Sequence, residues 1–104
     1  MEKKINYCEQ KIKKNILPND LQKLTFVFDS VFNQKIKKDV LPHNLRQLTF
    51  GTNFNKKIKK EVLSNNLQQL IFGKDFNQKI KKEVLPNNLQ QLTFGRLFNK
   101  KIKK

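Results

Sequence analysis

The chain has 104 residues, the length of one ordinary domain, and a formal net charge of +15. Hydrophobic residues make up 37% of it, too many for a disordered chain and enough for a core of Phe, Leu and Ile. No segment approaches the roughly 18 apolar residues of a membrane span, and no apolar run follows the N-terminus as in a secretory signal. Cys8 is the single cysteine, so no internal disulfide can form. We therefore expect an intracellular protein, cytoplasmic by default, with no membrane partner.

The positive charge has two interpretations that the sequence leaves open. Lysine is abundant together with Asn, Ile and Phe, whereas arginine occurs only at Arg46 and Arg96, which is typical of compositional drift toward AT-rich codons. Surfaces that read nucleic acid favour arginine, because its planar fork fits phosphates and base edges. A dense lysine surface nevertheless attracts nucleic acid and other polyanions.

Taken in chain order, the sequence divides into a short lead-in and a run of repeats. The expected boundaries are 1–7 for the lead-in, 8–16 for a half unit, and 17–40, 41–62, 63–84 and 85–104 for the units that follow. In the half unit, Cys8 stands where later units have Phe, which favours a small buried side chain over a nucleophile. The unit that comes next carries two extra residues between Phe26 and Phe32. Residues 63–82 and 85–104 agree at fifteen of twenty positions, so the repeat is not accidental.

The repeating unit reads Leu-Pro-x-Asn-Leu-x-x-Leu-x-Phe-Gly-x-x-Phe-Asn-x-Lys-Ile-Lys-Lys-acid-Val. Its strand phenylalanine recurs at intervals of 22, as Phe50, Phe72 and Phe94. The run Leu45-x-x-Leu48-x-Phe50 is the strand signature of leucine-rich repeats, and residues two apart share one face of a strand. No stretch has a helical period. The sequence therefore predicts a leucine-rich-repeat-like solenoid with short parallel β-strands, mostly irregular returns and little helix.

Three sets of repeated positions carry structural expectations. The core is predicted from the apolar positions, which in unit 41–62 and the residue after it are Leu45, Leu48, Phe50, Phe54, Ile58, Val62 and Leu63. A glycine after the strand phenylalanine is expected to leave the strand with a positive φ; the residues are Gly51, Gly73 and Gly95. Asparagines after the second phenylalanine are expected to point inward and bond backbone groups at the turns; they are Asn33, Asn55, Asn77 and Asn99.

These motifs resemble the FNIP repeat of slime moulds and giant viruses of amoebae, over about residues 8–104. The resemblance implies a leucine-rich-repeat-like solenoid used for protein binding. Larger members of the family often carry an F-box, a module that recruits a ubiquitin ligase; only about seven residues precede the repeats here, so that role is not transferred. Where the family often has Pro before the Ile, this chain has Lys35, Lys57, Lys79 and Lys101.

The outward positions of the strands are the predicted contact surface for a protein partner, whose identity the sequence does not give. They are Arg46, Gln47, Thr49, Gln68, Gln69, Ile71, Gln90, Gln91 and Thr93. Ile71 is the best single contact, because the other units have Thr at that position. The alternative is a plain solvated sheet face.

A second hypothesis uses the lysines, which we call the lysine columns: Lys35, Lys37, Lys57, Lys59, Lys79, Lys81, Lys101 and Lys103. Stacked units would bring them together as a ridge that binds nucleic acid or another polyanion weakly and without sequence preference. No aromatic residues are interleaved with them for base stacking. A third hypothesis is self-association through uncapped solenoid ends, where Leu97 replaces the polar Asn53 and Asp75.

The sequence contains no catalytic, metal-binding or cofactor-binding motif. Its acidic residues follow the repeat and are not gathered into a site. His43 occupies a turn position that other units fill with Asn, which favours a turn residue over a metal ligand or a base. We therefore expect a non-catalytic protein-protein interaction scaffold without a cofactor.

Overall fold

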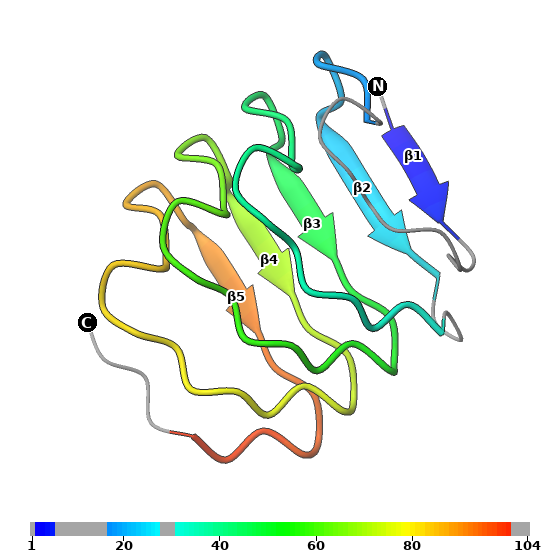
Figure 1. Cartoon of the computed structure of the whole chain (residues 1–104), viewed down its shortest axis with the longest axis vertical. Helices are drawn as coiled ribbons and strands as arrows, with labels where there is room; N and C mark the ends of the chain where they lie inside the picture. The colour runs from blue at the N-terminus through cyan, green and yellow to red at the C-terminus, as the bar shows by residue number, and fades with distance from the viewer. Residues whose placement is uncertain (1, 6–16, 28–30, 101–104) are drawn as a thin grey trace.

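The computed structural model describes residues 2–5, 17–27 and 31–100, and these residues form one parallel sheet whose strands are joined by irregular returns (Figure 1). The strands are β1 (Glu2–Ile5), β2 (Lys23–Phe26), β3 (Gln47–Thr49), β4 (Gln69–Ile71) and β5 (Gln91–Thr93). They lie side by side in chain order, and each neighbouring pair is parallel. The described residues contain no helix. The predicted leucine-rich-repeat-like solenoid is confirmed.

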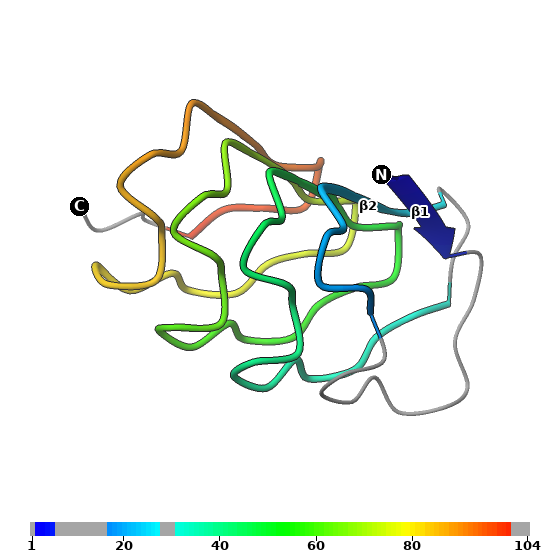
Figure 2. The same cartoon turned by 90° about the horizontal axis from the view of Figure 1, so that it is seen from above.

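The repeat length of the sequence sets the register of the sheet. Leu48 is the partner of Leu70 on the next strand, and Leu70 is the partner of Leu92. Each step of 22 residues therefore carries the chain once around the solenoid and returns it to the same position. Figure 2 shows the resulting coils following one another side by side across the molecule. Since one coil cannot enclose its own apolar side chains, burial depends on this stacking.

The apolar positions of the repeat form one continuous core. The strand leucines Leu24, Leu48 and Leu70 are completely buried, and so are Leu21, Leu45 and Leu67. Every residue of the core predicted from unit 41–62 is buried, as listed here: Leu45, Leu48, Phe50, Phe54, Ile58, Val62 and Leu63. Strand alternation and the 22-residue period were sufficient to identify them.

Phenylalanines form two parallel stacks that run through this core. One stack contains Phe26, Phe50, Phe72 and Phe94, whose successive ring centroids lie 5.5 to 5.6 Å apart. The other contains Phe32, Phe54, Phe76 and Phe98, with successive centroids 5.9 to 6.2 Å apart. Within each coil the two rings stack more closely, at 4.4, 4.0, 3.8 and 3.7 Å. Aromatic pairs of this kind contribute about 0.5–1.5 kcal/mol each beyond the area that they bury.

Strand β1 comes from segment 1–7, which the sequence analysis set apart as a lead-in. Its residues Glu2–Ile5 pair in parallel with β2, and Lys3 takes the register position of Leu24. The leucine-rich pattern is therefore broken at this strand, although Ile5 stands opposite Phe26. Parallel pairing uses backbone groups alone, so a segment can join the sheet without carrying the repeat motif.

The glycines after the strand phenylalanines do not have the expected conformation. No glycine among the described residues has a positive φ, so that expectation was wrong. Glycine is needed there because successive coils approach closely. A Cβ atom on Gly73 would overlap the carbonyl oxygen of Gly51, and one on Gly95 would overlap that of Gly73 and lie 2.8 Å from the Cα of Lys74.

Positive φ angles occur instead at Asp39 (70°) and Glu61 (69°). Both residues sit in a four-residue turn that is closed by a backbone hydrogen bond, from Val40 N to Lys37 O (3.3 Å) and from Val62 N to Lys59 O (3.4 Å). Each acid is the third residue of its turn, the position at which type II turns require a positive φ. Aspartate tolerates this conformation better than glutamate does.

The asparagines after the second phenylalanine form a hydrogen-bonded ladder between coils. Asn55 N donates to Asn33 Oδ1 at 2.8 Å, Asn77 N to Asn55 Oδ1 at 2.9 Å, and Asn99 N to Asn77 Oδ1 at 3.0 Å. The predicted bonding to backbone groups is confirmed. The predicted inward position was wrong, because Asn33 and Asn99 are exposed and the two between them are half-buried. The amides satisfy backbone N–H groups at the rim of the solenoid.

Candidate functional site

The outward positions of the strands form one surface, as the alternation of the strands requires. Gln47, Gln69 and Gln91 are register partners, and Thr49, Ile71 and Thr93 are partners in the same way. The nine predicted contact residues are all half-buried or exposed, and we call them the strand face: Arg46, Gln47, Thr49, Gln68, Gln69, Ile71, Gln90, Gln91 and Thr93. The structure therefore brings the predicted set together on one side of the sheet.

The strands that carry the strand face are joined by a regular pattern of backbone hydrogen bonds. Arg46 N and Gln47 N both donate to Gln22 O, at 2.8 and 3.0 Å. The same bonds recur one coil later, from Gln68 N and Gln69 N to Arg46 O. Because the backbone is fixed in this way, the side chains of each column keep the spacing of adjacent strands, about 4.8 Å. Arg46 is the only charged residue among these nine, and Lys23, the exposed register partner of Gln47 on β2, adds a second positive charge at the side of the same surface.

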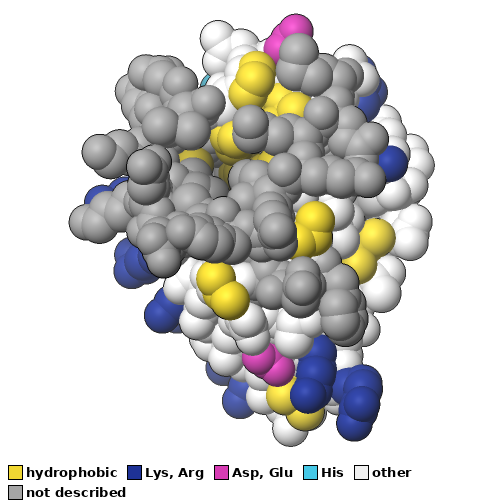
Figure 3. Space-filling model, turned by 90° about the vertical axis from the view of Figure 1, so that its right-hand side faces the viewer, with side chains coloured by type: hydrophobic (Ala, Val, Ile, Leu, Met, Phe, Trp, Pro, Cys, Tyr) yellow, Lys and Arg dark blue, Asp and Glu magenta, His cyan; other side chains and the backbone are white. Residues whose placement is uncertain are grey.

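The lysine columns lie on the returns rather than on the sheet. All six of their members within the described residues are exposed: Lys35, Lys37, Lys57, Lys59, Lys79 and Lys81. Lys101 and Lys103 lie outside the described residues. A shallow hollow between two coils is lined by basic residues and one acid, namely Lys57, Lys59, Lys60, Lys81 and Glu83 together with Ile58 and Val84. In Figure 3, basic side chains appear at several places around the edge of the molecule.

Few acids neutralise these lysines. Between residues 31 and 100 the structure shows one ion pair, in which Lys38 Nζ lies 3.3 Å from Glu61 Oε2. Both side chains are more than half exposed, so the pair contributes little to stability. The lysine columns are therefore solvated positive charge, able to respond to a polyanion.

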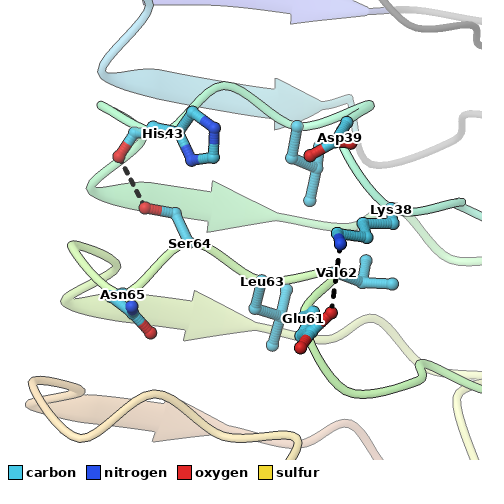
Figure 4. Close-up of a pocket in the computed structure, with 9 residues that line it drawn as sticks. Lys38, Asp39, His43, Glu61, Val62, Leu63, Ser64 and Asn65 are labelled. Atoms are coloured by element: carbon cyan, nitrogen blue, oxygen red, sulfur yellow. Dashed lines mark hydrogen bonds and ion pairs between the residues drawn. The ribbon is translucent and has the colours of Figure 1, made fainter.

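A second hollow combines His43, Ser64, Asp39 and Glu61, residue types that occur in catalytic sites (Figure 4). Their geometry here is structural. Ser64 Oγ donates to the backbone carbonyl of His43 at 2.6 Å, not to its ring, and accepts a hydrogen bond from Asn66 N at 3.0 Å. A hydroxyl engaged in this way fixes the turn, and its proton is donated to a backbone carbonyl rather than to a side-chain base.

Ser64 and a second asparagine ladder were missed by the sequence analysis. Asn44 Nδ2 donates to Asn19 O at 3.1 Å, Asn66 Nδ2 to His43 O at 2.9 Å, and Asn88 Nδ2 to Asn65 O at 3.1 Å. The available signal was the asparagine that directly precedes Leu-x-x-Leu in three successive units, at Asn44, Asn66 and Asn88. Ser64 stands where neighbouring units have proline, and its hydroxyl adds one more bond between coils.

No functional metal site or membrane segment emerges from the described part of the chain. It holds no group of three or more His, Cys, Asp or Glu side chains that could bind a metal ion. Across residues 2–5, 17–27 and 31–100 there is also no helix with the length and apolar character that crossing a bilayer requires. Cys8 lies outside these residues.

Comparison with a solved structure supports the fold. The giant-virus protein CroV588, described as a novel circular leucine-rich-repeat protein, is 52% identical to this chain and superposes with a TM-score of 0.84. The match covers 89% of this chain and 13% of that one, so this chain spans about an eighth of its neighbour's length. A comparison with curated proteins found no match.

The family model for the FNIP repeat matches residues 8–53, 32–75, 54–97 and 76–104. These overlapping matches extend from residue 8 to the last residue, and successive matches begin 24, 22 and 22 residues apart. The stacked phenylalanines and the asparagine ladder show what the Phe-Asn pair of the repeat does in the folded chain. The chain belongs to the FNIP-repeat family.

Proposed function

We propose that the chain is a non-catalytic, intracellular scaffold that binds another protein through the strand face. The observation that carries this proposal is that the nine residues of the strand face carry one charge in a chain of net charge +15, with Ile71 half-buried between Thr49 and Thr93. Protein interfaces are depleted of charge at their cores and anchored by apolar side chains. The family and its leucine-rich-repeat-like fold support a binding role, and the single cysteine supports a reducing compartment.

The proposed binding uses side chains on a rigid support. Ile71 O accepts a hydrogen bond from Phe50 N at 2.8 Å, and Leu70 next to it is completely buried. The backbone of this strand is therefore fixed before a partner arrives, and only side chains of the strand face lose freedom on binding. Such preorganisation lowers the entropic cost of association.

A charge substitution at Ile71 tests the proposal. Proteins captured by the wild-type chain are compared with those captured by Ile71→Glu and by Lys59→Gln, a control in the lysine columns. We expect Ile71→Glu to weaken the binding of a specific protein partner, one whose capture survives nuclease treatment, by about tenfold or more. Losing one apolar anchor has an effect of this size. Equal capture by Ile71→Glu and the wild type would refute the strand face as the contact surface.

The exposed lysine columns favour a second candidate function, the weak binding of nucleic acid without sequence preference. Neighbouring coils carry these lysines at matching positions, and the single ion pair shown in 31–100 leaves most of their charge available. Binding of a generic duplex is compared at low and physiological salt, with a basic peptide of matched charge as the control. If the chain binds the duplex more tightly than the peptide does, and still binds at physiological salt, this candidate is supported. If it binds no better than the peptide, the lysines are a solvated surface without a binding role.

A further inference from the structure

The basic hollow between two neighbouring returns has the features of a small anion site, and we call it the return hollow. Its volume is about 300 Å³, at the lower end of the range for small-molecule sites. Two coils supply its walls, so it exists only because the coils stack. One coil contributes Lys57, Ile58, Lys59 and Lys60, and the next contributes Lys81, Glu83 and Val84.

Alternation along the return gives the hollow an apolar floor and a charged rim. Ile58 and Val84 belong to the core and are 4% and 5% exposed. Lys57 and Lys59, on either side of Ile58, are both exposed. Lysine stems pack along apolar surface while their ammonium groups stay in water. The positive charge of the hollow is therefore concentrated at its rim, within reach of a ligand from solvent.

The charge of the rim calls for a multivalent anion. Four ammonium groups and one carboxylate leave the hollow with a formal charge of +3. Lysines on neighbouring coils repel one another, and this repulsion falls when negative charge lies between them. A ligand with one negative charge would leave most of the repulsion in place. A ligand with three or more negative charges would neutralise the rim.

The equivalent position one coil earlier is already neutralised. Lys38 and Glu61 stand 22 residues before Lys60 and Glu83. Figure 4 shows Lys38 Nζ directed at Glu61 Oε2, 3.3 Å away. Among the described residues, Lys60 and Glu83 form no such ion pair. Glu61 has a positive φ and Glu83 does not, so the two carboxylates leave turns of different conformation. Lys60 therefore keeps its charge for a ligand, and Lys38 does not.

The lining of the hollow favours phosphates over bases. Lysine is a compact point charge with three donors, which suits phosphate oxygens without requiring a planar group. None of the residues that line the hollow is aromatic, so a nucleobase has no stacking partner there. The ligand that fits best is thus a short run of linked phosphates, which carries several negative charges in a small volume.

We propose that the return hollow binds a chain of two or three linked phosphates, such as inorganic triphosphate or the triphosphate group of a nucleotide. Lys60 and Lys81, one from each coil, hold the phosphates between them, and the carboxylate of Glu83 limits the affinity. This inference rests on the second candidate function, since it uses the same lysine columns, and it names one site and one ligand class within them.

The test is a calorimetric titration of the whole chain with inorganic triphosphate, at physiological salt and without divalent cations. We expect saturable binding of one triphosphate per chain. Lys60→Gln should raise the dissociation constant about fivefold or more, through loss of a charge-assisted hydrogen bond, whereas Glu83→Gln should lower it. The matched control is Lys38→Gln, which removes the same charge one coil earlier and should change the constant less than about twofold. Lys38 and Lys60 are both exposed, so neither variant disturbs the core.

Two nucleotides distinguish the sources of the phosphates. Similar binding of adenosine triphosphate assigns the site to the triphosphate group of either source, and binding of inorganic triphosphate alone assigns it to the inorganic source; both results support the proposal. Adenosine monophosphate that binds as tightly as inorganic triphosphate would overturn it, because contacts to the base would then dominate. So would the absence of saturable triphosphate binding, or equal losses for Lys60→Gln and Lys38→Gln.

Duplex binding by the same chain tests the second candidate function separately. A duplex that binds no better than the basic peptide removes that function, while saturable triphosphate binding that depends on Lys60 still establishes the return hollow. A duplex that binds more tightly than the peptide, with no triphosphate bound, leaves the lysine columns as a diffuse polyanion surface and overturns the return hollow as a site.

Discussion

The phenylalanine stacks predict that the same substitution costs very different amounts at two positions of one column. Phe76 is completely buried and stacks against four rings, those of Phe54, Phe72, Phe94 and Phe98. Phe98, one coil later, is partly buried and stacks against two described rings. Phe76→Ala and Phe98→Ala therefore remove the same atoms from an interior and a terminal environment.

The expected magnitudes follow from this difference. A buried phenylalanine removes about 150 Å² or more from water, worth about 4 kcal/mol at 25 cal/mol per Å². Lost stacking adds to this, so Phe76→Ala should cost about 4–5 kcal/mol, a large share of the 5–15 kcal/mol that stabilises a typical domain. Phe98→Ala should cost about half as much, because part of its ring is already in water and it stacks against half as many described rings.

Urea unfolding followed by far-ultraviolet circular dichroism measures both changes, since the chain has no tryptophan. Phe76→Leu and Phe98→Leu provide a milder pair, should the interior alanine variant not fold, with expected costs of about 1.5 and 0.5 kcal/mol. Equal costs at the two positions would refute the reasoning, because they would mean that the last coil is as well packed as the inner ones.

Three further substitutions test other contacts between coils by the same unfolding measurement. Gly73→Ala should destabilise the chain by about 2–3 kcal/mol, because its Cβ overlaps a backbone carbonyl of the preceding coil. Gly95→Ala should cost less, since the last coil can shift. An unchanged urea midpoint of unfolding for Gly73→Ala would contradict the close approach of the coils. Asn77→Ala should lower the free energy of unfolding by about 1–2 kcal/mol, because the backbone N–H of Asn99 loses its acceptor. An unchanged stability would mean that water satisfies that N–H equally well. Glu61→Asn should stabilise by about 0.5 kcal/mol, because asparagine accepts a positive φ more readily, whereas Glu83→Asn, at a position without a positive φ, should not.

Much of the strand face could be predicted because strand alternation acts locally. Once the Leu-x-x-Leu-x-Phe run was placed on a strand, Leu48 had to face inward and Gln47 and Thr49 outward. The structure confirms this pattern on β3 and β4. The roles of His43 and Ser64 could not be read in the same way. Their bond joins residues 21 apart in sequence, and its geometry depends on how two turns stack.

The sequence by itself determined the period, the core and the outward columns of this protein. A 22-residue repeat with leucine and phenylalanine at fixed positions can bury those side chains only by stacking, so the solenoid follows from the hydrophobic effect and strand alternation. Tertiary structure decided what lies between the coils: why Gly73 must lack a side chain, where Asn55 and Asn77 donate and accept, and how Glu2–Ile5 joins the sheet. These features depend on distances between backbones of different coils, and such distances are fixed only when the coils are packed.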